Sequence, residues 1–167
     1  MLSLALPKGS LEEQTMRLLT EADLTPHRSS DRDYRVTIDD ARIGEVRILR
    51  PQEIPIYVEK GYFDLGISGW DWVQETGSDV VSVMDLAYNR YTVGRPVKVV
   101  LAVAGDSPVQ RGQDIPPGSR ISTEYPNLTR QYFDRLGIPV EIYRSYGATE
   151  AKVPDIADAL VDVTETG

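Results

Sequence analysis

The stretch that decides the fold is GATEAKVPDIADALVDVTETG, residues 147–167. Its apolar residues predict the end of a short helix that runs into a buried strand: Ala157, Ala159, Leu160, Val161 and Val163. The polar residues 164–167 then break this pattern and predict a loop. A strand that delivers a loop of small polar residues is typical of a phosphate-binding loop.

Asp162 and the residues after it carry groups suited to a phosphorylated sugar. Thr164 and Thr166 offer hydroxyl groups, and Gly167 lacks the side chain that would keep a phosphate away from the backbone N–H groups. Asp162 cannot bind a phosphate directly, but it could hold a pair of ribose hydroxyls or a Mg²⁺ ion. By spacing alone, an ordinary strand followed by a turn explains these residues equally well, because short glycine motifs recur by chance.

Outward from this stretch, strands alternate with helices. We expect strands at residues 2–6, 36–38, 46–49, 63–67, 80–86, 97–103, 121–123 and 140–143. We expect helices to open at a capping box formed by Ser10 and Glu13, at Pro51, after Ser68 and at Pro126. The alternation predicts an α/β protein with mainly parallel sheets. The sequence pattern changes after the strand that is expected to end near residue 86, which suggests two lobes, 1–90 and 91–167.

Several burial patterns follow from the apolar spacing. The run 97–103 is almost continuously apolar and predicts a strand buried on both faces, and 63–67 predicts another buried strand. Leu128, Tyr132 and Leu136 mark the inner face of the helix that opens at Pro126. In the first helix, Glu12 is expected to face water.

Composition limits the functional classes. The 167 residues include no cysteine and one histidine, His27, so a thiolate metal site, a cysteine nucleophile and a histidine-based zinc site or serine triad are not expected. His27 is expected at the surface. The net charge of −8 argues against general nucleic-acid binding. With no membrane-length apolar run and no signal peptide pattern, a cytoplasmic location is expected.

Two further turns are candidates for contact with an anion. Lys8 and Gly9 lie between the first strand and the first helix, where the helix N-terminus favours negative charge. Ser68 follows the strand 63–67 and is interpreted first as an N-cap and second as a ligand donor. For Lys8, a solvated loop position is an equally good interpretation.

Three motifs, in this order, resemble the ATP phosphoribosyltransferase family: LALPKGSL at 4–11, LRPQEIPIYVEKGYFDLGISGWDWV at 49–73, and ISTEYPNLTRQYFDRLGIPVEIYRSYGATEAKVPDIADALVDVTETG at 121–167. The resemblance covers nearly the whole chain. It implies two α/β lobes with a fold like a type II periplasmic binding protein and an active site in the cleft between them. It also implies a glycosyltransferase that performs the first step of histidine biosynthesis. ATP and 5-phosphoribosyl 1-pyrophosphate (PRPP) would give N1-(5-phospho-β-D-ribosyl)-ATP and pyrophosphate, with Mg²⁺ required.

The resemblance assigns site residues by motif. For PRPP these are Glu150, Asp162, Thr164, Glu165, Thr166 and Gly167. For ATP these are Lys8, Gly9, Arg50, Ser68, Gly69, Asp71 and Tyr125, the last together with Pro126 and Asn127. No single catalytic base is nominated, and no protein metal site, because Mg²⁺ is expected mainly through the substrate pyrophosphate.

The chain departs from the family pattern in two places. Many members carry arginine where this chain has Ser10 and Trp70, which would weaken ATP binding unless another arginine such as Arg50 compensates. The segments GSLEEQT and SSDRDY are similar to the corresponding sequences of long-form members. That implies histidine as feedback inhibitor, acting through a C-terminal regulatory domain, and a homo-oligomer, dimeric or hexameric. Neither that domain nor the returning segment of the first lobe is expected within residues 1–167, and Gly167 is expected to be the edge of a fragment.

Three alternatives stay open from the residues. A two-lobed solute-binding protein would use the same fold without catalysis, although no export signal supports it. A type I phosphoribosyltransferase would share the strand, acid and Thr-Gly loop, but it usually has two adjacent acidic residues, whereas Asp162 stands between Val161 and Val163. An inactive regulatory or truncated form is the third.

Overall fold

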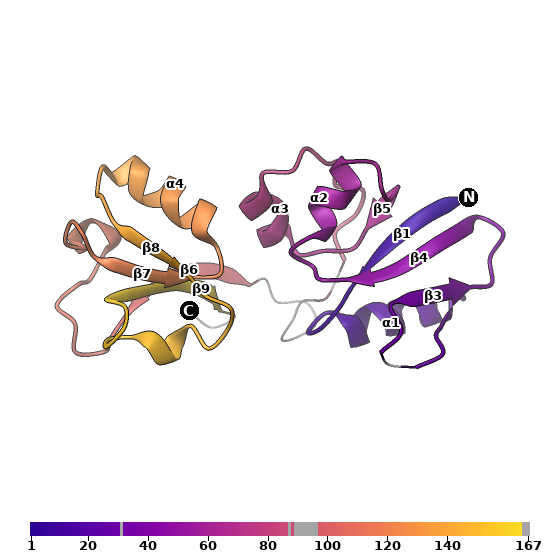
Figure 1. The fold of residues 1–167 in the computed structure, drawn as a ribbon, viewed down its shortest axis with the longest axis horizontal. Coiled ribbons are helices and arrows are strands. Elements are labelled where there is room, and N and C mark those ends of the chain that lie inside the picture. The colour runs from indigo at the N-terminus through magenta and orange to yellow at the C-terminus, as the bar shows by residue number, and fades with distance from the viewer. Residues whose placement is uncertain (31, 87, 89–96, 165–167) are drawn as a thin grey trace. The chain divides into compact units, whose positions relative to one another are not determined.

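The computed structural model describes every residue except 31, 87, 89–96 and 165–167 (Figure 1). The chain divides into two compact units, Met1–Arg95 and Pro96–Gly167. The division predicted from the sequence lies after residue 90.

The first unit is built on a five-stranded sheet with the order β2-β3-β4-β1-β5. The strands are β1 (Leu2–Pro7), β2 (Pro26–His27), β3 (Arg35–Ile38), β4 (Ile43–Leu49) and β5 (Leu65–Gly66). β1 runs parallel to both β4 and β5, while β3 pairs antiparallel with β4 and with β2. The parallel strands therefore end at a common edge of the sheet.

Helices cover both faces of this sheet. Figure 1 shows α1 (Glu12–Glu21) on one face, and α2 (Ile54–Glu59) and α3 (Trp70–Thr76) on the other. α1 buries Thr15 and Leu19, one turn apart, and Leu19 packs into a core with Leu4, Leu6 and residues of β3 and β4. On α2, Ile54 and Val58 pack so closely on Gly66 that a Cβ at this position would meet both side chains. Gly66 therefore lets α2 approach β5.

The second unit is a four-stranded sheet with the order β6-β9-β7-β8. Its strands are β6 (Lys98–Val103), β7 (Arg120–Thr123), β8 (Glu141–Arg144) and β9 (Ala159–Thr164). β7 pairs parallel with both β8 and β9, and β6 pairs antiparallel with β9 along its whole length. Short 3₁₀ turns lie at Gly112–Asp114 and Glu150–Lys152.

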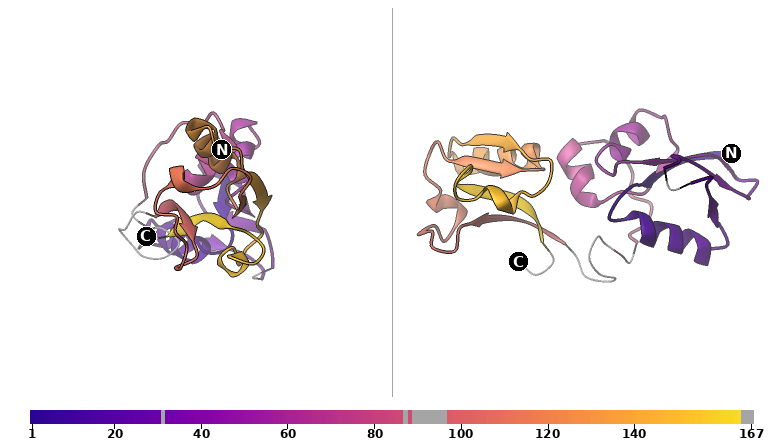
Figure 2. Two further views of the ribbon diagram at one scale, coloured as in Figure 1. Left: turned by 90° about the vertical axis from the view of Figure 1, so that its left-hand side faces the viewer. Right: turned by 60° about the horizontal axis from the view of Figure 1, so that its bottom comes forward.

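Helix α4 (Pro126–Leu136) covers one face of this second sheet (Figures 1 and 2). Pro126 stands in its first turn and Gly137, with φ +69°, ends it, as the sequence predicted. The buried face consists of Thr129 and Phe133, with Leu128, Tyr132 and Leu136 only partly buried. Tyr132 and Leu136 of the predicted inner face do pack against the core, but the centre of the buried face is Phe133, which clusters with Ile121 and Val161.

Three predicted strands differ from the structure. Residues 80–86, which all lie within the described ranges, form neither strand nor helix, and Val81 and Val83 are 87% and 75% exposed. The run 97–103 is the edge strand β6, so Val99 is 39% exposed rather than buried on both faces. The segment 63–67 contributes only the two residues of β5 at the other sheet's edge. β5 and β6 are edge strands with one neighbour each, and residues 80–86 pair with no strand of the described chain. Apolar residues in all three segments therefore stay partly exposed to solvent.

Two helix starts also differ. α1 begins at Glu12 with Leu11 as its N-cap, and the Glu12 carboxylate, rather than that of Glu13, accepts a hydrogen bond from the Gly9 N–H (3.3 Å). The expected capping box of Ser10 and Glu13 was therefore wrong. α2 begins at Ile54, three residues after Pro51, which places Pro55 in the first turn, where its missing N–H costs no intrahelical bond.

Candidate functional site

Three predicted site turns meet at the carboxyl edge of the first sheet. In the ladder, Pro7 of β1 lies opposite Leu49 of β4, and the Lys8 N–H donates to the Leu49 carbonyl (2.7 Å). Lys8 and Arg50 thus leave the sheet side by side. The Ser68 hydroxyl donates to the Pro51 carbonyl (2.7 Å) and fastens the turn after β5 to the turn after β4. The Lys8-Gly9, Arg50 and Ser68-Gly69 turns therefore form one surface of the first unit.

Lys8 is held by an ion cluster that the sequence did not reveal. Its ammonium lies 3.1 Å from the Glu12 carboxylate, which also accepts a hydrogen bond from the Arg28 guanidinium at 2.6 Å. The Glu12 side chain is only 14% exposed, so the expectation that it faces water was wrong. The Lys8 ammonium also lies 6.0 Å from the centre of the Tyr34 ring. Lys8 is therefore fixed from two sides.

The electrostatics keep Glu12 ionised. Burial raises the pKa of its carboxyl group, but hydrogen bonds from Lys8, Arg28 and the Gly9 N–H lower the pKa more, and the net shift is downward. At neutral pH the Glu12 carboxylate is therefore the anion that holds both Lys8 and Arg28 beside the N-terminus of α1.

The Ser68-Gly69-Asp71 turn has a different cap from the one predicted. The N-cap of α3 is Gly69, so the N-cap interpretation of Ser68 was wrong. A Cβ on Gly69 would collide with the Asp71 carboxylate, so a larger residue at this position would displace the Asp71 side chain. Trp70 is 59% exposed, whereas Trp72 is buried at 7%. Of the two tryptophans, Trp70 is the one that offers a surface aromatic ring.

The carboxyl edge of the second sheet gathers a second set of predicted residues. β7, β8 and β9 are parallel and end at Thr123, Arg144 and Thr164. In β9 the side chains alternate: Ala159, Val161 and Val163 are buried, and Asp162 and Thr164 are half-buried on the other face. The Asp162 carboxylate accepts a hydrogen bond from the Val163 N–H (2.7 Å). Asp162 and Thr164 therefore share a face, and the chain leaves the strand directly after them.

The other residues of the predicted PRPP set are placed as follows. Glu150 begins a 3₁₀ turn in the loop after β8, and its side chain is exposed. Glu165, Thr166 and Gly167 lie outside the described residues. The phosphate loop itself thus stays a sequence prediction, while the strand that leads into it is observed.

Tyr125 follows the end of β7 by two residues, and its side chain is 0% exposed. Its N–H donates to the Thr123 hydroxyl (2.8 Å), and its carbonyl accepts a hydrogen bond from Thr129 (2.7 Å). The backbone of Tyr125 is therefore fixed in the turn between β7 and α4, and a contact of this turn with ATP stays a prediction.

The acidic residues fit a magnesium ion that arrives on a substrate. Within the described ranges, no group of three or more His, Cys, Asp or Glu side chains converges as a metal site would require. Mg²⁺ bound with a nucleotide or pyrophosphate usually takes one or two carboxylates and several phosphate oxygens. Asp162 and Glu150 are the carboxylates of the predicted PRPP set that the structure describes, so they suit this mode of binding.

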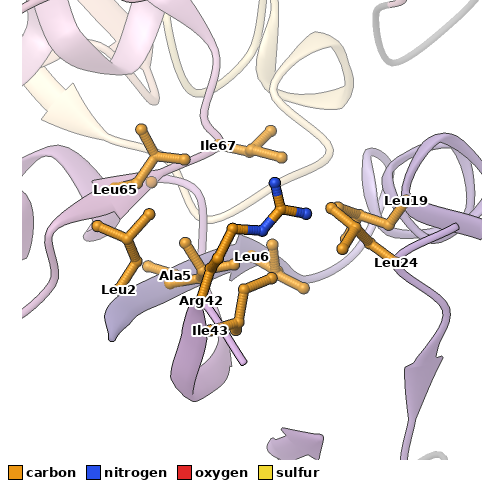
Figure 3. A pocket seen from close by; sticks show the side chains of 11 residues that line it. Leu2, Ala5, Leu6, Leu19, Leu24, Arg42, Ile43, Leu65 and Ile67 are labelled. Carbon is orange, nitrogen blue, oxygen red and sulfur yellow. The ribbon is translucent and has the colours of Figure 1, made fainter. Parts of the chain in front are cut away.

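An apolar pocket in the first unit has a different character. It has a volume of about 260 Å³ and is lined largely by leucine and isoleucine side chains from β1, α1 and the β5 region (Figure 3). Its charged lining residue, Arg42, already binds the Asp40 carboxylate at 2.7 Å. None of the predicted site residues lines this pocket. An anionic substrate has no partner there, so the two sheet edges, rather than this pocket, are the candidate sites.

Comparison with known proteins decides the family. The family profile described as ATP phosphoribosyltransferase matches residues 50–167. The chain belongs to the ATP phosphoribosyltransferase family. It is 48% identical over 166 residues to the ATP phosphoribosyltransferase of Thermodesulfovibrio yellowstonii and 49% identical over 166 residues to that of Koribacter versatilis, covering 99% of this chain in both cases. These relatives are named as enzymes, and no solute-binding protein is favoured.

A solved member of the ATP phosphoribosyltransferase family has the same fold. The ATP phosphoribosyl transferase (HisG:HisZ) complex from Thermotoga maritima matches with a TM-score of 0.80 at 30% identity, over 100% of this chain and 76% of that chain. The predicted α/β class, with mainly parallel sheets and a periplasmic-binding-protein-like fold, is confirmed. The chain covers 56% of the length of the two curated relatives above. No helix in the described part of the chain is long and apolar enough to cross a membrane.

Three residues near the two sheet edges were not predicted from the sequence: Arg28, Glu12 and Lys152. Arg28 lies far from Lys8 along the chain, and no local pattern connects them. Glu12 follows Lys8 by four residues, a spacing that pairs charges on a helix, but Lys8 precedes the helix, so that rule gave no signal. Lys152 was quoted within the deciding stretch without a role, and the structure places its ammonium on Ser145 and Gly147.

Proposed function

We propose that the protein of which this chain is part transfers the 5-phosphoribosyl group of PRPP to N1 of the adenine of ATP. The N1 lone pair attacks the ribose C1, the bond from C1 to the pyrophosphate oxygen breaks, and the electron pair leaves with pyrophosphate. The observation that carries this proposal is the end of β9, where Asp162 and Thr164 lie on one face of the strand at the carboxyl edge of a parallel sheet. Family membership gives this edge its substrate.

The two sheet edges divide the substrates in this proposal. Asp162 binds the ribose hydroxyls, Thr164 and the predicted loop 165–167 bind the 5′-phosphate, and Glu150 lines the same site. Lys8, Gly9, Arg50 and the Ser68-Gly69-Asp71 turn bind ATP. Glu12 holds the Lys8 ammonium and the Arg28 guanidinium together at this edge, and we expect Lys8 to face the triphosphate. Rate enhancement then comes from alignment of two anionic substrates and from stabilisation of the leaving pyrophosphate, rather than from a strong base.

Magnesium enters this proposal with the substrate. Asp162 and Glu150 would hold it, together with phosphate oxygens. When bound, the ion neutralises charge on the pyrophosphate. The chain's own contribution is to hold the ribose with Asp162 and the phosphates with hydroxyl and N–H donors.

The proposal also covers assembly into an oligomer and regulation by histidine. The structural neighbour from Thermotoga maritima is a HisG:HisZ complex. We expect this protein to work as an oligomer too, and its resemblance to long-form members supports feedback inhibition by histidine. A cytoplasmic location fits a biosynthetic enzyme of this kind.

The test is the formation of phosphoribosyl-ATP by the full-length protein from ATP, PRPP and Mg²⁺, followed by absorbance with and without histidine. Asp162→Asn should lower activity, because the amide cannot hold the hydroxyls or the ion as the carboxylate does. Asp106→Asn, which removes the same charge from an exposed loop of the same unit, is the matched control. Absence of product with wild-type protein, or wild-type kinetics in Asp162→Asn, would contradict the proposal.

A further inference from the structure

Trp70 is an exposed aromatic residue at the carboxyl edge of the first sheet. It is the first residue of α3 and is 59% exposed, whereas Trp72, two residues later, is 7% exposed. Residues two apart on a helix do not share a side, so Trp72 packs into the unit while Trp70 stays open to solvent. Among the described residues, the Trp70 ring has no recorded contact with another ring or with a cation. Packing within its own unit therefore does not account for this indole.

The backbone that carries Trp70 is fixed to both neighbouring turns. The Ile67 N–H donates to the Ala5 carbonyl (3.0 Å), which places the turn after β5 beside the end of β1. The Ser68 hydroxyl donates to the Pro51 carbonyl (2.7 Å) and ties the same turn to the one after β4. Trp70 follows Ser68 by two residues, so their Cα atoms lie within about 8 Å of each other. The exposed ring is thus carried by the sheet edge that is proposed to bind ATP.

The proposed reaction restricts how the adenine base can be held. N1 of the base is the nucleophile, so its lone pair must stay free to attack the ribose C1. A hydrogen bond to N1 would occupy that lone pair, whereas an aromatic ring on the face of the base leaves the N1 edge free. Stacking on aromatic side chains uses only the π-face of a base and contributes substantially to its binding. Trp70 offers such a ring at the proposed ATP edge.

A second exposed ring lies near this edge but is already engaged. Tyr34 precedes β3 and is 57% exposed, and the Lys8 ammonium lies 6.0 Å from the centre of its ring. An ammonium over an aromatic ring is attracted to its face, so one face of Tyr34 has a partner within the unit. Of the two rings, Trp70 is therefore the one suited to a base.

We propose that the Trp70 indole stacks on the adenine of ATP and holds the base with its N1 edge free for the ribose. This inference rests on the proposed function, and it names a residue that recognises the base rather than the phosphates. Many family members carry arginine at this position, and a guanidinium is also planar and stacks on aromatic faces. The replacement by Trp70 therefore loses a positive charge but keeps a flat surface, and stacking offsets the loss of ATP binding that the missing charge would cause.

Isothermal titration of the full-length protein with ATP and with tripolyphosphate, both with Mg²⁺, separates the base from the phosphates. Trp70→Leu removes the flat ring but stays apolar. It should weaken ATP binding about tenfold, the order expected for the loss of one stacked base. The affinity for tripolyphosphate should stay within about twofold of the wild type, because that ligand has no base. Trp70→Phe restores a flat ring and should recover most of the affinity for ATP.

The matched control is Tyr62→Leu, which removes another exposed ring from the same unit. Tyr62 is 68% exposed and precedes β5, so it lies at the opposite end of that strand from Trp70. Both affinities should be the same in this variant as in the wild type. Fluorescence gives a readout that does not depend on activity. ATP should quench the part of the tryptophan emission that Trp70→Phe removes, and tripolyphosphate should not quench it.

Three results would overturn the inference while the proposed function stands. The first is that Trp70→Leu binds ATP within about twofold of the wild type. The second is an equal loss of ATP and tripolyphosphate binding in Trp70→Leu, which would indicate a structural role. The third is Trp70 emission that acrylamide cannot quench in the ligand-free full-length protein, because another part of the protein then covers the ring. If the wild type binds neither ATP nor tripolyphosphate, the ATP edge of the proposed function fails, and this inference fails with it.

Discussion

The Arg28 guanidinium donates a hydrogen bond of 2.6 Å to the Glu12 carboxylate, which also pairs with Lys8. Arg28 thus brings a second cation to the carboxyl end of β1. In the sequence, Ser10 stands where many family members have arginine, and Arg50 was named as the residue that would compensate. The structure shows Arg28 paired within the cluster, whereas Arg50 is an exposed neighbour at the end of β4.

Glu12→Gln should raise the KM for ATP about threefold to tenfold, with little change in kcat. The amide keeps the shape of the side chain but loses the ion pairs that fix Lys8, and charge-assisted hydrogen bonds are the stronger ones. Steady-state kinetics with saturating PRPP measure this effect. Glu13→Gln, the same change at the adjacent exposed residue, should leave the KM unchanged. Equal effects of the two variants would contradict a positioning role for Glu12.

The same carboxylate predicts a pH dependence of stability. The pKa of Glu12 is lower in the folded chain than its reference value of 4.5, so its ion pairs stabilise the folded state fully above about pH 5. This contribution is lost as pH falls through the folded pKa, where the carboxylate becomes protonated. The difference in free energy of unfolding between wild type and Glu12→Gln should thus be constant near neutral pH and shrink as the pH falls below 4.5. Denaturant titrations at several pH values measure it, and a difference that grows as pH falls would refute the assignment.

Gly69→Ala should raise the KM for ATP, because a Cβ at this position collides with the Asp71 carboxylate and displaces that side chain from the proposed ATP site. We expect an effect of about threefold or more, since small displacements of positioning groups are costly. Gly105→Ala is the control, because that position has open space around its Cβ and needs no left-handed backbone. Kinetics of the two variants, compared under the same conditions, should differ.

The parts of the fold that local patterns specify were predictable. The first strand, the turn at Asp39 and Asp40, and the glycine after α4 each appear in the sequence and in the structure. Burial was harder to predict, because it depends on which strands become neighbours. β6 has the most apolar sequence of the second unit's strands, yet it lies at an edge, and no local feature of the sequence reports this.

In the candidate site, too, local patterns predicted some features, while contacts between distant residues could not be predicted. Lys8, Ser68 and Asp162 follow or end strands, so their placement at a sheet edge could be predicted from the α/β pattern alone. The contact of Arg28 with Glu12 could not, because it joins the loop before β3 to the start of α1. The interaction of Lys152 with Ser145 likewise depends on a left-handed alanine, a conformation that the residue type does not announce.

Phe133→Ala should destabilise the second unit by about 3–5 kcal/mol, the range for large aromatic residues removed from a core. Phe133 is 1% exposed and packs on Ile121 and Val161. Leu136→Ala on the same helix should cost less, about 1–2 kcal/mol, because Leu136 is only partly buried. Urea unfolding of both variants measures the difference. A larger loss for Leu136→Ala would restore the inner face that the sequence alone predicted.

Thr166→Val should raise the KM for PRPP about tenfold or more while leaving the KM for ATP nearly unchanged. Valine has nearly the shape of threonine but lacks the hydroxyl that the predicted loop offers to the 5′-phosphate, and a lost hydrogen bond to a charged group costs about 1.5–3 kcal/mol. Thr37→Val, the same change at an exposed position of β3, is the control. Kinetics with PRPP as the varied substrate make the measurement. An unchanged KM for PRPP would remove the loop after β9 from the site and leave Asp162 without its proposed neighbour, so this variant tests the assignment on which the division of substrates between the two sheet edges depends.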